Sequence, residues 1–250
     1  MSQGYRPGDI EVTGFWWMLI RVGNARTGKI DLALAGIMSF VAGAINAVGF
    51  LIAGAFSANM TGNVSALADE LAAGNLVMAL SFLGLFVAFV AGAAFAAFGI
   101  QAGERYGIRS VYSLAILFEA ALLFALGMSD LFDSRITGHE MLIITLCFVM
   151  GLQNAVTTMI SQARVRTTHV SGMATDLGIG LATLLGDKAA KSEAVPKLKL
   201  HALTLTCFAA GGVLGALVYS IAGHWVFIVG AAVLLMVAGP EAWLARRKGQ

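Results

Sequence analysis

Charge is scarce in this sequence. Only 12% of its residues are Asp, Glu, Lys or Arg, whereas soluble proteins carry about 25%. Hydrophobic residues make up 58% of the chain, and the mean hydropathy is +0.83. The few basic residues are confined to connections and tails, so the net charge of +2 gives no sign of a nucleic-acid partner. This composition excludes a water-soluble globule and predicts an integral membrane protein, whose first partner is the lipid bilayer.

Cysteine and proline are also rare, and no enzyme motif is present. The two cysteines, Cys147 and Cys207, both fall within apolar runs, so we expect neither a disulfide nor a metal-binding pair. The sequence contains no Walker A motif and no nucleophile elbow, and its histidines lack the spacing of metal ligands. We therefore expect no catalytic residues, no metal, no cofactor and no enzymatic activity.

The sequence is rich in long apolar runs. A helix needs about 20 apolar residues to cross a hydrocarbon core of about 30 Å. The predicted fold is all-α, with six transmembrane helices at residues 32–56, 76–100, 111–126, 141–161, 200–221 and 225–243. We accordingly divide the chain into an N-terminal tail (1–31), a six-helix membrane domain (32–245) and a C-terminal tail (246–250).

The basic residues predict the orientation of these helices. Fifteen of the sixteen Lys and Arg residues lie in the two tails and in the second and fourth connections, and only Arg135 lies on the other side. Basic residues concentrate on the cytoplasmic side of membrane proteins. Both tails should therefore be cytoplasmic.

An internal repeat relates the two halves of the membrane domain, residues 32–128 and 140–245. The segment 43–48, Gly-Ala-Ile-Asn-Ala-Val, matches 151–156, Gly-Leu-Gln-Asn-Ala-Val. A polar Thr/Ser-Gly break follows in each half, at 58–62 and at 168–172. Because each half has three spans, the second should be inverted relative to the first, with one break near the outer face and the other near the inner face. Inverted repeats with paired breaks are typical of transporters and channels.

These paired elements resemble those of a known family. Gly-Ala-Ile-Asn-Ala with Ala-Asn-Met-Thr-Gly-Asn, and Gly-Leu-Gln-Asn-Ala with Arg-Thr-Thr-His-Val-Ser-Gly-x-x-Thr-Asp, are similar to motifs of the YoaK family of small bacterial inner-membrane proteins. The resemblance covers about residues 32–245. It implies a multi-pass protein of the bacterial cytoplasmic (inner) membrane with about six spans. The family has no assigned activity, so the resemblance implies a topology and no substrate.

Amides inside the apolar runs are the first candidates for a functional site. Asn46 and Asn154 occupy matching places in the two halves, and Gln153 adjoins the second. An amide in hydrocarbon must find polar partners. These three side chains either line a polar path near the pseudo-twofold axis or hydrogen-bond neighbouring helices as structural glue.

The two breaks supply the remaining candidates. In the first, Asn59, Thr61 and Asn63 favour helix caps, and the short helix that follows would present a positive N-terminus to an anionic group. The alternative is a capped loop without a ligand. The candidates in the second break are Arg166, Thr168, His169, Ser171 and Asp176.

That second break could hold a phosphate or carboxylate. Alternatively, its arginines satisfy only the preference for basic residues on the inner side, and Asp176 pairs with one of them.

Glu119 is an acid within a predicted span. It and His169 are candidates for proton coupling, since an ionisable group in the membrane is costly unless paired or hydrated.

These residues are compatible with three functions. The residues favour a secondary transporter or channel for a small polar or anionic solute. A non-catalytic partner protein is the alternative, in which Gly/Ala faces such as Ala88-x-x-x-Gly92 and Gly211-Gly212-x-x-Gly215 assemble membrane subunits or a homo-oligomer. The least favoured is a membrane enzyme that uses His169, Asp176 and the arginines of the second break on an anionic head group.

Overall fold

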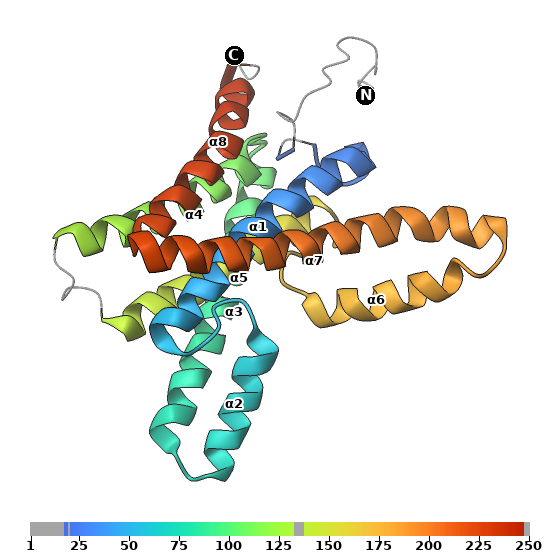
Figure 1. Ribbon diagram of the computed structural model, residues 1–250. Helices are drawn as coiled ribbons and strands as arrows, with labels where there is room; N and C mark the ends of the chain where they lie inside the picture. Colours follow the sequence, from blue (N-terminus) through green and yellow to red (C-terminus); the bar gives the residue numbers. More distant parts are fainter. Residues whose placement is uncertain (1–17, 20, 133–137, 248–250) are drawn as a thin grey trace.

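The computed structural model describes residues 18, 19, 21–132 and 138–247. This part of the chain is helical and contains no strand (Figure 1). Its elements are the 3-10 helix η2 (Gly23–Ala25) and the α-helices α1 (Gly28–Ala53), α2 (Met60–Ala72), α3 (Leu76–Arg105), α4 (Val111–Phe132), α5 (His139–Ile160), α6 (Val170–Thr183), α7 (Lys188–Ala222) and α8 (Trp225–Arg247).

Six of the described helices are long and apolar enough to cross a membrane, which confirms the predicted all-α membrane fold. They are α1, α3, α4, α5, α7 and α8, and the short α2 and α6 are the helices that follow the two polar breaks. The fifth span differs most from its prediction, because α7 begins at Lys188 and not at residue 200. The first turns of α7 carry charged residues and pack against α6, a source of helical stability that hydropathy does not detect.

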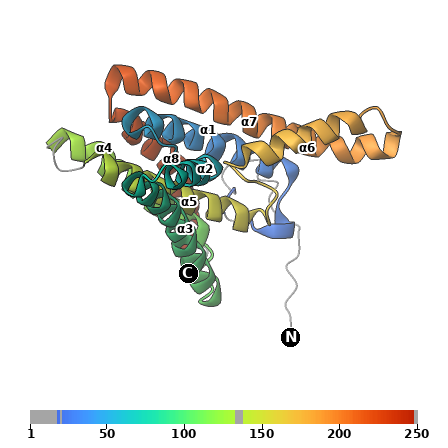
Figure 2. The ribbon, with the colours of Figure 1, turned by 90° about the horizontal axis from the view of Figure 1, so that it is seen from below.

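The spanning helices pack in pairs. α1 lies along α7, α3 lies along α5, and α4 lies along α8 (Figures 1 and 2). The two short helices fold back on their successors, so that α2 and α3 form one hairpin and α6 and α7 form another. Each hairpin thus connects a short helix to a spanning helix that pairs with the other half of the chain.

Glycines allow α1 and α7 to touch through their backbones. Gly43 of α1 lies against the carbonyl group of Phe208 in α7, and Gly211 of α7 lies against that of Phe40 in α1. A Cβ atom at either glycine would overlap the carbonyl oxygen. Small residues permit this close approach in lipid, where packing rather than a hydrophobic force holds helices together.

The same contact recurs between α3 and α5. Gly92 of α3 lies against the carbonyl of Phe148, and Gly151 of α5 lies against that of Phe89. Each glycine follows a phenylalanine by three positions, as Gly43 and Gly211 do. The same glycine-to-carbonyl contact therefore occurs at corresponding positions of the two halves. The small-residue faces predicted in α3 and α7 are occupied within the chain by these contacts.

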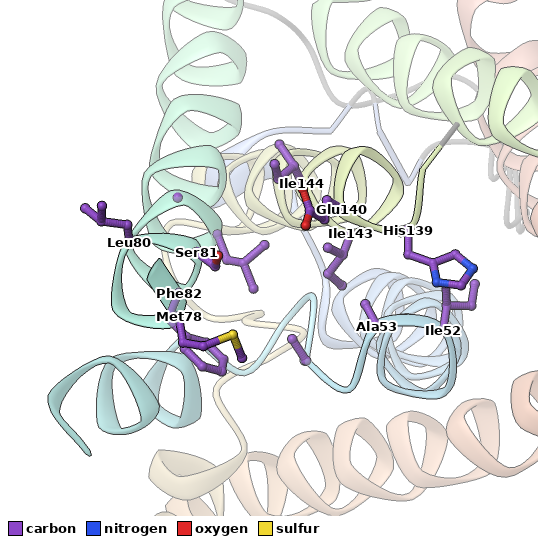
Figure 3. Close-up of a pocket in the computed structure, with 13 residues that line it drawn as sticks. Ile52, Ala53, Met78, Leu80, Ser81, Phe82, His139, Glu140, Ile143 and Ile144 are labelled. Carbon is purple, nitrogen blue, oxygen red and sulfur yellow. The ribbon is translucent and has the colours of Figure 1, made fainter. Parts of the chain in front are cut away.

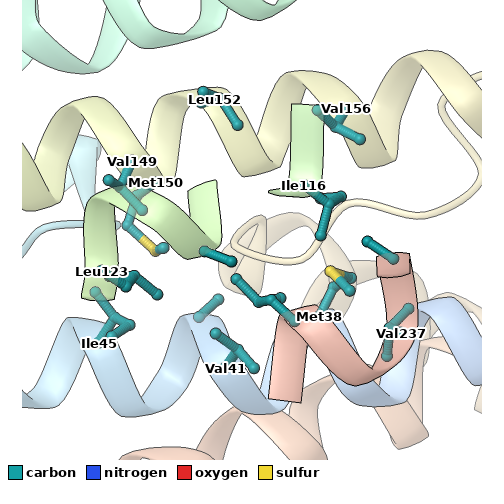
Figure 4. Packing of buried hydrophobic residues seen from close by; sticks show 14 of the residues in the cluster. Met38, Val41, Ile45, Ile116, Leu123, Val149, Met150, Leu152, Val156 and Val237 are labelled. Atoms are coloured by element: carbon teal, nitrogen blue, oxygen red, sulfur yellow. The ribbon is translucent and has the colours of Figure 1, made fainter. Parts of the chain in front are cut away.

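The core lies where α1, α4, α5 and α8 meet (Figure 4). Met38 and Ile45 of α1, Leu123 of α4 and Met150 of α5 are among its largest fully buried side chains. α3 and α7, in contrast, carry many exposed large apolar residues, such as Phe98 and Ile221. In a membrane protein such faces are the ones in contact with lipid.

The end of the predicted N-terminal tail packs into the helix bundle. Met18 and Leu19 are buried, and their backbone N–H groups donate to the carboxylate of Glu241 in α8, at 2.7 and 2.6 Å. α1 then begins at Gly28, after Thr27 caps its first turn, and so starts four residues before the predicted membrane domain. The described residues before α1, which are 18, 19 and 21–27, are therefore part of the fold.

Candidate functional site

A cavity of about 790 Å³ lies where the two polar breaks come together. The starts of α2 and α6 border it, α1, α3 and α7 contribute one residue each, and α5 contributes two. Eight of the candidates predicted from the sequence line it: Asn46, Asn59, Thr61, Asn154, Arg166, Thr168, His169 and Ser171.

The two breaks, which the sequence analysis places near opposite faces of the membrane, both border this one cavity, beside Asn46 in the C-terminal half of α1. Their depth in the membrane stays a prediction. The chain reverses after α1 at Gly54, whose φ of 67° is readily adopted by glycine. The N–H of Ala58 then donates to Oδ1 of Asn46 at 2.9 Å. The break has therefore returned by about 10 Å along α1, at 1.5 Å per residue.

The first turn of α2 is only partly capped. Oδ1 of Asn59 accepts from the N–H of Gly62 at 3.1 Å, and the N–H of Asn63 donates to the carbonyl of Asn59. Within the described chain, the N–H groups of Met60 and Thr61 have no such acceptor. The side chain of Asn63 does not line the cavity: it is 2% exposed and donates to the carbonyl of Phe56 at 2.8 Å. Asn63 thus fixes the loop.

The first turn of α6 lacks a side-chain cap. His169 occupies the N-cap position without a capping hydrogen bond, and its imidazole lies against Gly172. The N–H of Met173 donates to the carbonyl of His169 at 3.0 Å. In the described part of the chain, the N–H groups of Val170, Ser171 and Gly172 have no hydrogen-bond acceptor. These groups are the positive end of the helix dipole.

The wall of the cavity carries positive charge and hydrogen-bond donors. Arg166 lines it, and no Asp or Glu is among its lining residues. Asn46 is only 8% exposed, and since its Oδ1 faces the N–H of Ala58, its Nδ2 is left for the cavity. These donors suit an anion or a polar molecule that accepts hydrogen bonds. Oδ1 of Asn154 is an acceptor that is buried and has no partner among the described residues, so this one atom suits a donor instead.

Asp176 does not line this cavity and does not pair with an arginine among the described residues. Oδ2 of Asp176 lies 3.8 Å from Nδ1 of His201, beside a separate cavity between α6 and α7. Arg164 instead binds Asp31, with its Nε 2.9 Å from Oδ2, and donates to the carbonyl of Gly23. Among the described residues, the alternative in which Asp176 pairs with an arginine is not found, and for Arg164 the acid comes from the start of α1.

Glu119 and Gln153 lie together in the core, away from the cavity. Both are fully buried, and the Gln153 side chain is the neighbour that reaches the Glu119 carboxyl group. Nε2 of Gln153 also lies 3.8 Å from the sulfur of Met38. Neither carboxyl oxygen of Glu119 has a hydrogen bond of ordinary geometry within the described chain. Although Gln153 and Asn154 are neighbours in sequence, they lie on different faces of α5: Gln153 points into the core and Asn154 lines the cavity.

A third cavity, of about 540 Å³, lies among α1, α3 and α5, and the sequence analysis did not predict it (Figure 3). Its wall is mostly apolar, with Met78, Phe82 and Ile143 among the lining residues. His139 and Glu140 at the start of α5 are its charged or titratable members. Apart from these two and Ser81, its wall carries no polar side chain.

The chain is similar over most of its length to two known proteins. It is 25% identical to UPF0700 transmembrane protein YoaK of Bacillus subtilis (strain 168) over 209 residues, which are 82% of this chain and 92% of that protein. It is 29% identical to UPF0700 transmembrane protein RA0705 of Rhizobium meliloti (strain 1021) over 235 residues, which are 90% of this chain and 95% of that protein. No solved structure matches.

The six apolar helices and the two transmembrane relatives show that the chain is a multi-pass membrane protein. The relatives also confirm the resemblance to the YoaK family that the sequence motifs indicate. The family described as "Protein of unknown function (DUF1275)" matches residues 34–239, most of the membrane domain, and the chain belongs to that family.

Proposed function

We propose that this protein is a secondary transporter or channel for a small polar or anionic solute. The observation that carries the proposal is the 790 Å³ cavity, which is lined by corresponding residues of both halves. Asn46 faces it with Asn154, Thr61 with Ser171, and Asn59 with His169. A site at the interface of two repeats, formed where helices are broken, is the common plan of transporters.

The reciprocal packing supports an inverted relation between the halves. Gly43 contacts Phe208 as Gly151 contacts Phe89. The first spanning helix of each half therefore packs against the second spanning helix of the other half, α1 against α7 and α5 against α3. Three spans per half and cytoplasmic basic residues make one half upside down relative to the other. In this proposal both termini are cytoplasmic and the membrane is the bacterial inner membrane.

Two alternatives have less support. An enzyme that used His169 and Asp176 together would need both at one site, but they line different cavities. A partner protein would offer its small-residue faces to other subunits, but Gly92 and Gly211 are occupied by Phe148 and Phe40 of the same chain. We therefore propose a non-enzymatic protein whose solute site is complete within one chain.

Cysteine accessibility tests the proposal. In a background without Cys147 and Cys207, single cysteines replace Asn46, Thr61, Asn154 or Ser171. Membrane-impermeant thiol reagents are then applied from each side separately. Cysteine at Leu152, which is 1% exposed in the core, is the matched control.

We expect the cavity positions to be labelled and the Leu152 position to resist. Protection of the positions of Asn46 and Asn154 from both sides would mean that water does not reach the cavity, and would overturn the transport proposal. If the Asn46 variant misfolds, the Asn154 position decides, because Asn154 lines the same cavity and is only partly exposed.

A further inference from the structure

The cavity between the two short helices has the wall of an anion site. α2 and α6 both start there, and each presents free N–H groups at the positive end of its dipole. Because both helices start at the same cavity, the positive ends of their two dipoles add there. Both helices exceed three turns, with 13 and 14 residues.

A buried side chain supplies an independent indication. Asn46 is 8% exposed and belongs to neither short helix. The N–H of Ala58 determines which amide atom faces the loop, because a donor requires the oxygen. Nδ2 of Asn46 therefore remains, with no partner in the described chain, at the cavity wall. A bound acceptor in the cavity would give this donor a hydrogen bond.

The charges of the wall favour an anion over a cation. Arg166 is the charged side chain that lines the cavity, and carboxylates, the usual ligands of hard cations, do not contribute to it. The volume of about 790 Å³ is within the range of small-molecule sites.

We propose that the cavity binds a small carboxylate or inorganic oxyanion between the N-termini of α2 and α6, with Arg166 and Nδ2 of Asn46 as further donors. The inference rests on the proposed function for its purpose, but the binding site can exist without transport.

Acetate and acetamide, which are nearly equal in shape and differ in charge, are the test probes. Full-length protein in detergent is titrated with each at constant ionic strength, and binding is followed by calorimetry and by the midpoint of thermal unfolding. Acetate should bind and raise the midpoint, whereas acetamide should not. Equal effects of the two probes would overturn the anion site and favour a neutral solute.

Variants locate the binding. Arg166 is exposed, so Arg166→Gln should fold, and it should weaken acetate affinity by about tenfold, the usual cost of losing a charged hydrogen bond. Arg109→Gln is the matched control, since Arg109 is an exposed arginine between α3 and α4 and lies outside the cavity. Acetate binding unchanged in Arg166→Gln, or equally weakened in Arg109→Gln, would contradict the proposal.

Asn46→Asp tests the buried donor. Aspartate keeps an oxygen for the N–H of Ala58 but replaces Nδ2 with a second oxygen, so acetate binding should be lost. If this variant unfolds, Arg166→Gln decides alone. Undiminished acetate binding in a folded Asn46→Asp protein would overturn the role of Asn46.

The same oxyanion chemistry occurs in a lipid headgroup. Repeating the titration in nanodiscs of phosphatidylcholine alone, and with phosphatidylglycerol added, separates the two sources. Equal acetate affinity in both supports a soluble anion, whereas competition by phosphatidylglycerol that Arg166→Gln removes supports a headgroup in the same site.

A flux assay in proteoliposomes separates this inference from the proposed function. Acetate binding without any flux would leave the site in place and overturn transport. Flux of a neutral solute without acetate binding would overturn the anion site and leave transport in place.

Discussion

At the scale of single residues, glycine and buried polar side chains determine what this bundle can do. Gly43 and Gly151 are needed for backbone contact between helices, and Asn46 positions a loop while it borders the cavity. Sequence reasoning found these residues because they stand at matching places in two halves. It could not assign Asn63 to loop packing or separate Gln153 from Asn154, because the direction of a side chain depends on the helices around it.

Replacing Gly43 by alanine should destabilise the protein. The added methyl would overlap the carbonyl of Phe208, so α1 and α7 would have to move apart, at a cost of about 1–3 kcal/mol. Thermal unfolding in detergent measures the effect. Gly99→Ala in α3 is the control, because a Cβ there meets nothing within 4 Å. Equal stability of the Gly43 variant and the control would contradict the packing.

Replacing Glu119 by glutamine tests the buried acid. Glutamine has nearly the same shape and no carboxylate to keep in hydrocarbon, so we expect an unchanged or higher unfolding midpoint. Under proton coupling, the variant should also lose proton flux in proteoliposomes loaded with a pH-sensitive dye. The exposed Glu193→Gln is the control. A markedly lower midpoint would show that Glu119 stabilises the fold and would argue against coupling.

At the scale of elements, an ionic cluster holds the segment before α1 against the loop before α6. Asp31 accepts from Arg26 at 2.6 Å and from Arg164 at 2.9 Å, and Arg26 also donates to the carbonyls of Met18 and Arg21. The sequence assigned these residues to a tail and a basic loop. Arg26 and Asp31 are five positions apart, and a hydropathy pattern does not show that two charged residues at this spacing form an ion pair.

Asp31→Asn should loosen this cluster. Arg26 is fully buried and would lose its only carboxylate among the described residues, whereas Arg164 is 40% exposed and would be rehydrated. We expect a loss of about 2–4 kcal/mol, below the usual cost for a wholly buried pair. Thermal unfolding and proteolysis of the N-terminal segment report it, with the exposed Asp69→Asn as control. Unchanged stability and protease resistance would mean that Met18 and Leu19 alone hold the segment.

At the scale of the whole molecule, the helices pair across the two halves. α1 with α7 and α3 with α5 leave neither half as a unit with its own core. Phe-x-x-Gly occurs once in each of the six spanning helices, a sequence signal that could have predicted this pairing. The inversion of the halves across the membrane stays a prediction, and its test is topological.

Reporter fusions provide that test. A fluorescent protein at the C-terminus should fluoresce, and alkaline phosphatase at the same place should be inactive, because both termini are predicted to be cytoplasmic. Phosphatase inserted between α4 and α5, the connection between the halves, should be active. The reverse activities would mean that the protein is inserted the other way up, and matching activities at both places would exclude an odd number of spans per half.

The sequence alone determined that this is a six-helix membrane protein and identified half of the residues that line the cavity. Those conclusions follow from local properties: length of apolar runs, and polar residues repeated in matching places. Only the tertiary structure decided that the two breaks share one cavity, that Asp176 faces another, and that Asp31 holds Arg164. Each depends on a turn or contact between distant segments, such as Gly54 and the bond from Ala58 to Asn46, which no local pattern encodes.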